Sequence, residues 1–304
     1  MEQTQNKRTS KTVAYRTMNS KISDYIQFTK LRLSLLVVFS AAVCFAFGSE
    51  TMDWTKFLLL ILGGFLVTAS SNGFNQIIEK ETDKLMTRTA NRPLPQERMT
   101  NTEAYFIASV MGIAGVLILF KCINPLSGIL GLTALLLYTF AYTPLKKVTP
   151  FAVFVGAFPG AIPPLIGFVA TTADFGHISL NAWILFAIQF IWQFPHFWAI
   201  AWVVEDDYRK AGFKMLPSEG GRDKSSAFQI LMYSLSLIPI SLLAVFFKMT
   251  GNIATVILIL SGAAFAFQAY KLFNDCSIKS ASRLMFASFI YLPIVQIAIL
   301  MDKI

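Results

Sequence analysis

Long apolar segments alternate with short polar loops along almost the whole chain. Nine of these segments are each close to the roughly 20 residues that a helix needs to cross a bilayer. They cover residues 33–49, 56–78, 104–121, 125–143, 150–171, 181–204, 226–248, 252–273 and 284–301. The pattern predicts an all-α polytopic membrane protein, with nine transmembrane helices forming one bundle over residues 24–304. Residues 1–23 are polar and basic, and we expect them to form a disordered tail.

The placement of the basic residues predicts the orientation of this bundle. Hydrophobic residues make up 55% of the 304 positions and charged residues only 14%, which favours a bilayer over water as the solvent. If the amino terminus is cytoplasmic and the carboxy terminus outside, 22 of the 26 Lys and Arg residues fall on the cytoplasmic side, as the positive-inside rule expects. Basic residues spread by topology argue against nucleic-acid binding. The absence of a transit-like presequence favours a bacterial cytoplasmic membrane.

A polar stripe ends the second apolar segment. At about 100° per residue, Asn72, Asn75, Glu79 and Asp83 share one face of a helix that is otherwise apolar upstream. All four side chains offer oxygen, and the three cysteines show no CxxC spacing, so Mg²⁺ or Ca²⁺ fits better than zinc or copper. Polar groups at membrane depth usually face a cavity. The stripe therefore predicts a magnesium site, although a solvated helix end is the simpler alternative.

Cationic residues accompany this stripe. Arg88 and Arg92 follow directly, and guanidinium groups suit the oxygens of a diphosphate. The segment Tyr142-Thr-Pro-Leu-Lys146-Lys147 ends the fourth apolar segment on the same predicted side. Acidic and basic groups together indicate a metal-bridged phosphate, whereas anchoring at the membrane surface could by itself explain the two lysines.

A second carboxylate cluster, Glu205-Asp206-Asp207, ends the sixth apolar segment on the same side. Within that segment Gln189, Gln193, His196, Val203 and Asp207 share a helical face, so we expect His196 and Asp207 to face one cavity. His196 lies among aromatic residues, while the other histidine, His177, falls in an outer loop. His196 could be an iron ligand, a hydrogen-bond donor or a general base, or could simply pair with Gln193 or a backbone carbonyl.

Taken together, these motifs resemble the UbiA-type intramembrane prenyltransferases. The resemblance runs over residues 24–301 and depends on Asn75-x3-Glu79-x3-Asp83 after the second span, the Tyr-x-Pro-x-x-Lys-like element after the fourth and the carboxylates after the sixth. Four stretches are similar to the heme O synthase (protoheme IX farnesyltransferase) branch of that family. They are Asn72-x2-Asn75 continuing to Asp83-Lys-Leu-Met-x-Arg88-Thr-x2-Arg92-Pro-Leu, Gly156-x2-Pro-Gly-Ala-x-Pro-Pro-Leu-Ile-Gly167, Trp192-Gln-x-Pro-His196-Phe and Asp206-Asp-Tyr-Arg-x-Ala-Gly-x2-Met-Leu-Pro217.

The resemblance implies a site between two cytoplasmic loops, at about 79–103 and 205–225. Mg²⁺ would hold farnesyl diphosphate there, with protoheme (heme B) as acceptor and heme O as product, and a heme A synthase as a partner. The metal ligands would come from Asn75, Glu79, Asp83, Glu205, Asp206 and Asp207; Asn75, Asp83 and Arg88 would act on the diphosphate. Substrate binding would fall to His196, Arg92, Lys146, Lys147, Tyr142 and Asn72. Glu79 stands where the family commonly has Asp, and no DxxxD spacing shows which of residues 205–207 binds metal.

Two other classes of function fit parts of the pattern. A prenyltransferase of the same fold could act on a quinone precursor, although His196 among aromatic residues suits heme better than a small aromatic acid. A secondary transporter could use the two similarly placed acidic helix ends as internal repeats, but coupling sites usually lie near the membrane midplane. A structural heme-binding subunit would have no use for Asn75, Glu79 and Asp83.

Overall fold

The computed structural model describes residues 21–172 and 178–304. Most of the expected tail, residues 1–20, and the outer-loop His177 therefore lie outside the described residues. Residues 21–28 are helical, including residues 21–23, which were expected to belong to the disordered tail.

Over the described ranges, nine helical spans are long and apolar enough to cross a membrane, as the sequence predicts. The spans are α2 (Leu31–Gly48), α3 (Trp54–Ile78), α5 with η1 (Asn101–Ile123), α6 with η2 and α7 (Pro125–Leu145), α8 (Ala152–Val169), α9 (Leu180–Val203), α11 (Lys224–Phe246), α12 (Asn252–Asp275) and α13 (Ile278–Met301). The last span begins at Ile278 rather than at residue 284, because Ser277 caps it by accepting a hydrogen bond from Ser280 N.

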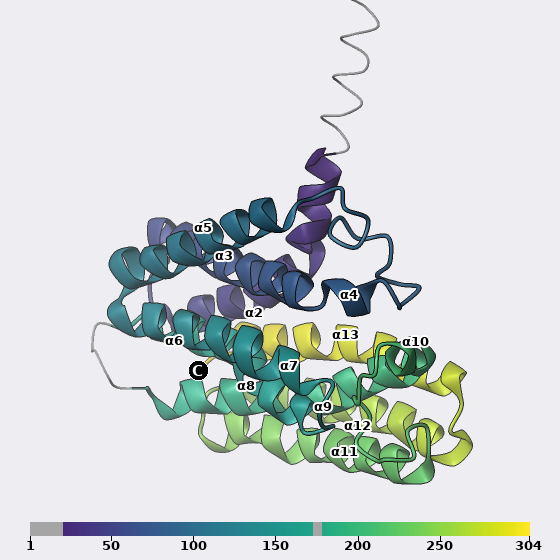
Figure 1. The fold of residues 1–304 in the computed structure, drawn as a ribbon. Helices are drawn as coiled ribbons and strands as arrows, with labels where there is room; N and C mark the ends of the chain where they lie inside the picture. The colour runs from purple at the N-terminus through teal and green to yellow at the C-terminus, as the bar shows by residue number, and fades with distance from the viewer. Residues whose placement is uncertain (1–20, 173–177) are drawn as a thin grey trace, which may run out of the picture.

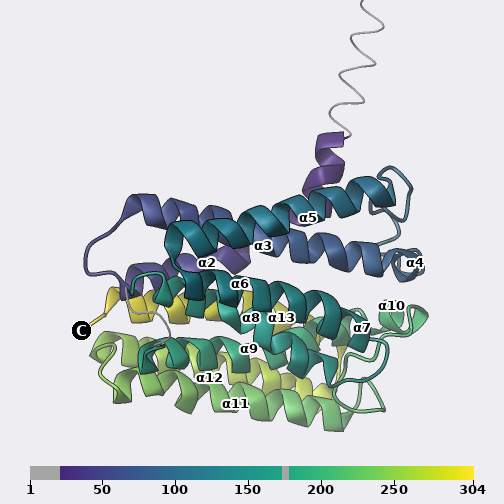
Figure 2. The same ribbon diagram turned by 60° about the vertical axis from the view of Figure 1, so that its left-hand side comes forward.

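The loops that carry the candidate chemistry meet at one end of the bundle. The short helices α4 (Lys80–Asp83) and α10 (Glu205–Lys210) follow α3 and α9, and α7 (Thr143–Leu145) ends the fourth span. Figures 1 and 2 show the long helices lying side by side, with α4, α7 and α10 at one end and the carboxy terminus at the other. Segments far apart in the sequence therefore share one end of the molecule, as expected for α3 and α9 running in the same direction.

Four helices form a ring around the middle of the molecule. Helix α2 packs against α8, α8 against α9, α9 against α13, and α13 against α2, and α3 packs beside α2. The α2 and α8 backbones approach closely at Gly167, where an added Cβ would lie 2.1 Å from the carbonyl oxygen of Ala41. Glycine at this contact allows the tight helix packing that membrane bundles use.

Gln189 and Gln193 of α9 donate hydrogen bonds to backbone carbonyls of α8, and a proline has freed one of these carbonyls. Pro164 has no N–H to donate to the carbonyl of Gly160, one turn earlier. Gln189 Nε2 donates a hydrogen bond to that carbonyl instead, at 2.7 Å. Gln193 Nε2 donates similarly to the carbonyl of Ala157, at 2.9 Å. These bonds place both glutamines between α8 and α9, on the face that borders the cavity described next.

Candidate active site

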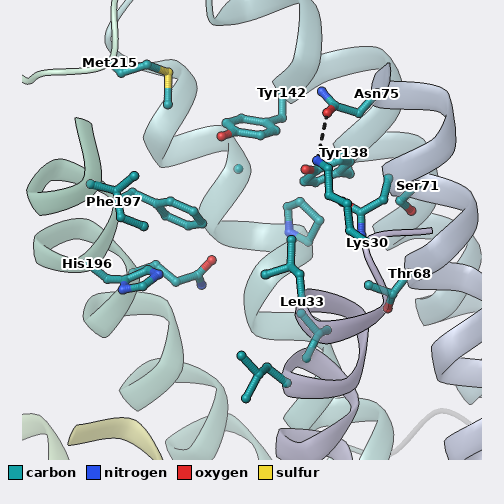
Figure 3. Close-up of a pocket in the computed structure, with 18 of the residues that line it drawn as sticks. Lys30, Leu33, Thr68, Ser71, Asn75, Tyr138, Tyr142, His196, Phe197 and Met215 are labelled. Carbon is teal, nitrogen blue, oxygen red and sulfur yellow. Dashed lines mark hydrogen bonds between the residues drawn. The ribbon is translucent and has the colours of Figure 1, made fainter. Parts of the chain in front are cut away.

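A cavity of about 380 Å³ lies inside the ring of helices, and α2, α3, η2 (Leu137–Tyr142), α8, α9 and α13 all contribute to its walls. Figure 3 shows Lys30, Asn75 and Tyr138 on one side of it and His196, Phe197 and Met215 on the other. Leu36 of α2 and Phe289 of α13 line the cavity and are 56% and 42% exposed. The cavity therefore opens sideways between α2 and α13, through an apolar rim.

The predicted polar stripe faces this cavity along its whole length. Asn72, Asn75, Glu79 and Asp83 all line the cavity and are buried, Asp83 completely. Helix α3 ends at Ile78, yet Asp83 N still donates to Glu79 O at 2.7 Å, so the helical spacing continues into α4. Asn75 Oδ1 accepts a hydrogen bond from Lys30 Nζ at 3.3 Å, drawn in Figure 3. The oxygen donors inferred from the sequence thus converge on one space.

Glu79 forms a buried ion pair with Lys146. Lys146 Nζ donates to Glu79 Oε1 at 2.7 Å, and the two side chains are only 10% and 6% exposed. The same ammonium group lies 4.7 Å from the ring centroid of Tyr142. Burial by itself lowers the pKa of Lys146, but the Glu79 carboxylate outweighs it and the net shift is upward. Lys146 therefore stays cationic at the wall of the cavity.

Asp83 has one paired oxygen and one without a partner. Its Oδ2 accepts from Arg92 Nη1 at 2.7 Å, while Oδ1 is buried and has no hydrogen-bond partner among the described residues. Burial raises the pKa of Asp83, and the Arg92 guanidinium only partly opposes this.

A buried carboxylate oxygen without a partner is costly and fits a bound cation. No three His, Cys, Asp or Glu side chains gather as a metal site in the described ranges, so further ligands would be amide oxygens or substrate.

The charges around the cavity favour an anion together with a cation. Among the lining residues are four cationic side chains and two carboxylates, a formal charge of +2; they are Lys30, Arg88, Arg92, Lys146, Glu79 and Asp83. Burial, together with the nearby Arg92 and Lys146, lowers the pKa of Lys30 to about 7. Cations crowded in this way are stabilised by a polyanion, since each one is repelled by the like charges beside it.

The second carboxylate cluster does not reach the cavity. Helix α9 ends at a break at Val204, with φ −106° and ψ 18°, and residues 205–210 form the separate helix α10. Backbone hydrogen bonds continue past this bend, from Val204 N to Ile200 O at 3.1 Å and from Tyr208 N to Val204 O at 3.0 Å. His196 lines the cavity but Asp207 does not, so the expectation that both face this cavity is wrong. Tyr208 is the α10 residue that lines the cavity.

Each carboxylate of α10 has a cationic partner instead. Glu205 pairs with Arg209 at 3.1 Å, and Asp206, 72% exposed, pairs with Arg222 at 3.0 Å. Asp207 pairs with Lys210 at 3.0 Å.

Asp207 also joins the two loops at this end of the bundle. Its Oδ1 accepts from Thr87 Oγ1 at 3.1 Å, and its Oδ2 accepts from Arg88 N at 3.2 Å. Hydrogen bonds from Lys210 and from the loop around residues 87–88 lower the pKa of Asp207. The structure thus places Asp207 as a tether for the loop that carries Arg88. Lys147, predicted alongside Lys146 as a binding residue, is exposed and does not line the cavity.

His196 lies on the α9 wall of the cavity, across from Leu33 of α2 (Figure 3). Its ring stacks on Trp192, with the centroids 4.3 Å apart and 18° between the planes. Its Nδ1 lies 2.7 Å from Ser288 Oγ of α13. Trp192, Gln193 and Phe197 line the cavity beside it. This wall offers flat aromatic surfaces and one imidazole, which suits a planar aromatic ligand.

Sequence reasoning missed several lining residues. From the sequence, Lys30 is explained as a membrane anchor. In the structure its positive φ of 47° turns the chain sharply before α2, and its side chain reaches Asn75. Tyr138 lies one turn before Tyr142 in η2, and both line the cavity. This spacing in the sequence could have indicated that Tyr138 faces the same side as Tyr142. Ser288 is an ordinary small residue of an apolar span and carried no signal of its own.

Comparison with known proteins shows which family the chain resembles. The model of the UbiA prenyltransferase family matches residues 35–292. A protoheme IX farnesyltransferase of Cytophaga hutchinsonii is 48% identical over 290 residues, covering 94% of this chain and 100% of the relative. A protoheme IX farnesyltransferase of Christiangramia forsetii is 44% identical over 289 residues, covering 93% and 94% of the two chains.

Solved structures share the fold. A structure of a digeranylgeranylglyceryl phosphate synthase has a TM-score of 0.76 at 20% identity and covers 93% of this chain and 98% of that one. A UbiA homolog from Archaeoglobus fulgidus bound to GPP and Mg²⁺ has a TM-score of 0.69 at 15% identity, with 91% and 99% covered.

Proposed function

The chain belongs to the UbiA prenyltransferase family, and from this premise we propose that it transfers a farnesyl group from farnesyl diphosphate to a vinyl group of protoheme, giving heme O. The observation that carries the proposal is the division of the cavity. One end holds four cationic side chains with two carboxylates, and the α9 wall holds aromatic rings with His196. The charged end suits a diphosphate with its metal, and the α9 wall suits a flat macrocycle.

Asp83 and Asn75 are the residues best suited to hold Mg²⁺ at the first end. The unpartnered Asp83 Oδ1 supplies a charged ligand, and Asn75 Oδ1 and Glu79 lie on the same helical face. Magnesium typically takes one or two carboxylates and completes its shell with substrate phosphate and water. When bound, Mg²⁺ would supply a counter-charge to the diphosphate. Glu205, Asp206 and Asp207 are paired with basic residues and do not line the cavity, so they are the weaker candidates.

The basic residues of this end would favour departure of the diphosphate. Arg92, Lys146 and Lys30 line the cavity and face the space beside Asp83 and Asn75, and Arg88 enters from the tethered loop. When the C1–O bond of farnesyl diphosphate breaks, its electron pair leaves with the diphosphate, and these cations stabilise the charge that develops there. The farnesyl cation forms between Tyr138, Tyr142 and Phe213, whose rings stabilise a cation and limit access of water.

Protoheme would bind against the α9 wall and supply the new bond. A vinyl carbon donates its π electrons to C1 of the farnesyl cation, which leaves a cation next to the macrocycle. Water then adds to that carbon and releases a proton, so the product is a hydroxyethylfarnesyl heme. The apolar opening between Leu36 and Phe289 gives both substrates a route from the lipid. The same proposal places the cationic end of the cavity at the cytoplasmic face of a bacterial membrane, with a heme A synthase taking up the product.

The direct test is a reconstituted reaction. We expect purified protein in lipid nanodiscs, supplied with protoheme, farnesyl diphosphate and Mg²⁺, to form a more hydrophobic heme whose mass corresponds to addition of a farnesyl and a hydroxyl group. Chromatography with mass detection would follow it. Asp83→Asn should abolish product, whereas Asp206→Asn, at an exposed carboxylate, should not.

Three results would redirect the proposal. Farnesylation of a phenolic acid such as 4-hydroxybenzoate, with no change to heme, would favour the quinone-precursor reaction. Turnover that continues undiminished in excess chelator would remove the role of the metal. Movement of substrate across sealed vesicles without chemical change would support the transporter alternative.

A further inference from the structure

Ser288 of α13 contacts His196 of α9 across the cavity wall. Ser288 is fully buried, His196 is 7% exposed, and Ser288 Oγ lies 2.7 Å from His196 Nδ1. A distance this short means that one of the two atoms donates a hydrogen to the other. Which atom donates decides the tautomer of the neutral imidazole.

The hydroxyl hydrogen of Ser288 is donated to a backbone carbonyl. Ser288 Oγ lies 2.6 Å from the carbonyl oxygen of Met285, which can only accept. A serine hydroxyl has a single hydrogen and two acceptor positions. Because that hydrogen points to Met285, Ser288 can only accept from the imidazole, and His196 Nδ1 carries the ring proton. The lone pair of the neutral ring is then on Nε2.

The orientation of the ring is held by two more contacts. Trp192 stacks on His196 and its Nε1 donates to the carbonyl oxygen of Ser288 at 3.0 Å, so α9 and α13 are joined twice at this level. Phe289 meets the ring edge-on, with the centroids 5.0 Å apart and 80° between the planes. Nε2 makes no hydrogen bond to any residue in the ranges 21–172 and 178–304, and His196 borders the cavity. An imidazole lone pair in a fixed direction is therefore presented to whatever occupies that space.

We propose that Ser288 is a positioning residue that keeps His196 in the Nδ1–H tautomer, so that Nε2 binds the iron of protoheme. This inference rests on the proposed function, because it takes protoheme as the occupant of the α9 wall. A histidine that binds a metal through one nitrogen almost always donates its other ring N–H to a fixed acceptor, and here the acceptor is a serine that passes its own hydrogen to a carbonyl. Iron bound at Nε2 would hold the macrocycle beside Trp192, and one edge of the macrocycle would then face the cationic end of the cavity.

The test compares heme binding by matched variants that do not need turnover. Ser288→Ala removes the acceptor of the imidazole proton, and we expect about tenfold weaker protoheme binding and a shifted Soret band, in line with the roughly 10–100-fold effects of such outer partners. Farnesyl diphosphate binding should not change. Ser234→Ala is the control, because Ser234 is also fully buried and bonds a carbonyl of its own helix, but on α11. Ser288→Cys, with a similar shape and a weak acceptor, should reproduce the shift if the alanine variant does not fold.

A double-mutant cycle separates positioning from packing. In a His196→Ala background, Ser288→Ala should have no further effect on heme affinity or spectrum. The inference is overturned if Ser288→Ala and Ser288→Cys bind heme with wild-type affinity and spectrum, or if Ser288→Ala weakens binding equally without His196. Product formation by the wild type, measured in parallel, tells the two failures apart: if heme is farnesylated while the Ser288 variants bind it normally, only this inference is lost.

Discussion

Replacing Lys146 by methionine tests how the buried carboxylate of Glu79 is balanced. The substitution keeps much of the length of the side chain but removes the ammonium group that lies 2.7 Å from Glu79 Oε1. Glu79 is 5% exposed, so it would stay buried without its cation. Removing one partner of a buried ion pair destabilises a protein by roughly 3–5 kcal/mol. At roughly 2–4 °C per kcal/mol, the scale for mid-sized domains, the midpoint of thermal unfolding should fall by on the order of 10 °C.

Magnesium should reverse part of this loss if the stripe is a metal site. A cation bound at Glu79 and Asp83 would replace the missing ammonium group and stabilise the folded state by mass action. At a Mg²⁺ concentration about 100 times its dissociation constant, the gain is about 2.7 kcal/mol. The double variant Lys146→Met/Glu79→Gln lacks both charges, so it should lose less stability than Lys146→Met and respond less to Mg²⁺.

Tryptophan fluorescence during heating, in nanodiscs with excess chelator or with Mg²⁺, measures the stability of all three proteins. The expected order of stability without metal is wild type, then the double variant, then Lys146→Met. Equal Mg²⁺ stabilisation of Lys146→Met and the double variant would refute the reasoning that the metal and Lys146 share one carboxylate. A Lys146→Met variant as stable as the wild type in chelator would show that the pair is not buried as described.

Two further predictions concern the loop tether and helix packing. Asp207→Asn should lower turnover because Arg88 becomes less ordered, but the Mg²⁺ concentration for half-maximal activity should not change. Asp206→Asn should change neither quantity. A raised Mg²⁺ requirement in Asp207→Asn would instead make Asp207 a metal ligand. Gly167→Ala would place a Cβ 2.1 Å from the backbone oxygen of Ala41 and should destabilise the fold by about 1–3 kcal/mol or more in thermal unfolding, because backbone cannot step aside. Gly64→Ala is its control, since a Cβ there would be 3.6 Å from Val38 Cγ2, and equal stability of the two variants would contradict the close α2–α8 contact.

Much of the architecture follows from the sequence alone. Apolar length sets the nine spans, because a helix must be long enough to cross the hydrocarbon layer with its backbone bonds satisfied internally. The 3.6-residue period places Asn72, Asn75, Glu79 and Asp83 on one face, and all four do line one cavity. The orientation of the bundle in the membrane was inferred from the Lys and Arg residues of the loops, and it stays a prediction.

The tertiary structure decided the features that depend on contacts between distant segments. Helical periodicity does not decide which partner a side chain finds, and Asp207 bonds the loop of Arg88 instead of lining the cavity with His196. The pairing of Lys146 with Glu79, and the reach of Lys30 to Asn75, required spans far apart in the chain to pack against each other. Ser288 is the extreme case: a small residue in an apolar helix contacts His196 only because α13 lies against α9 at that level.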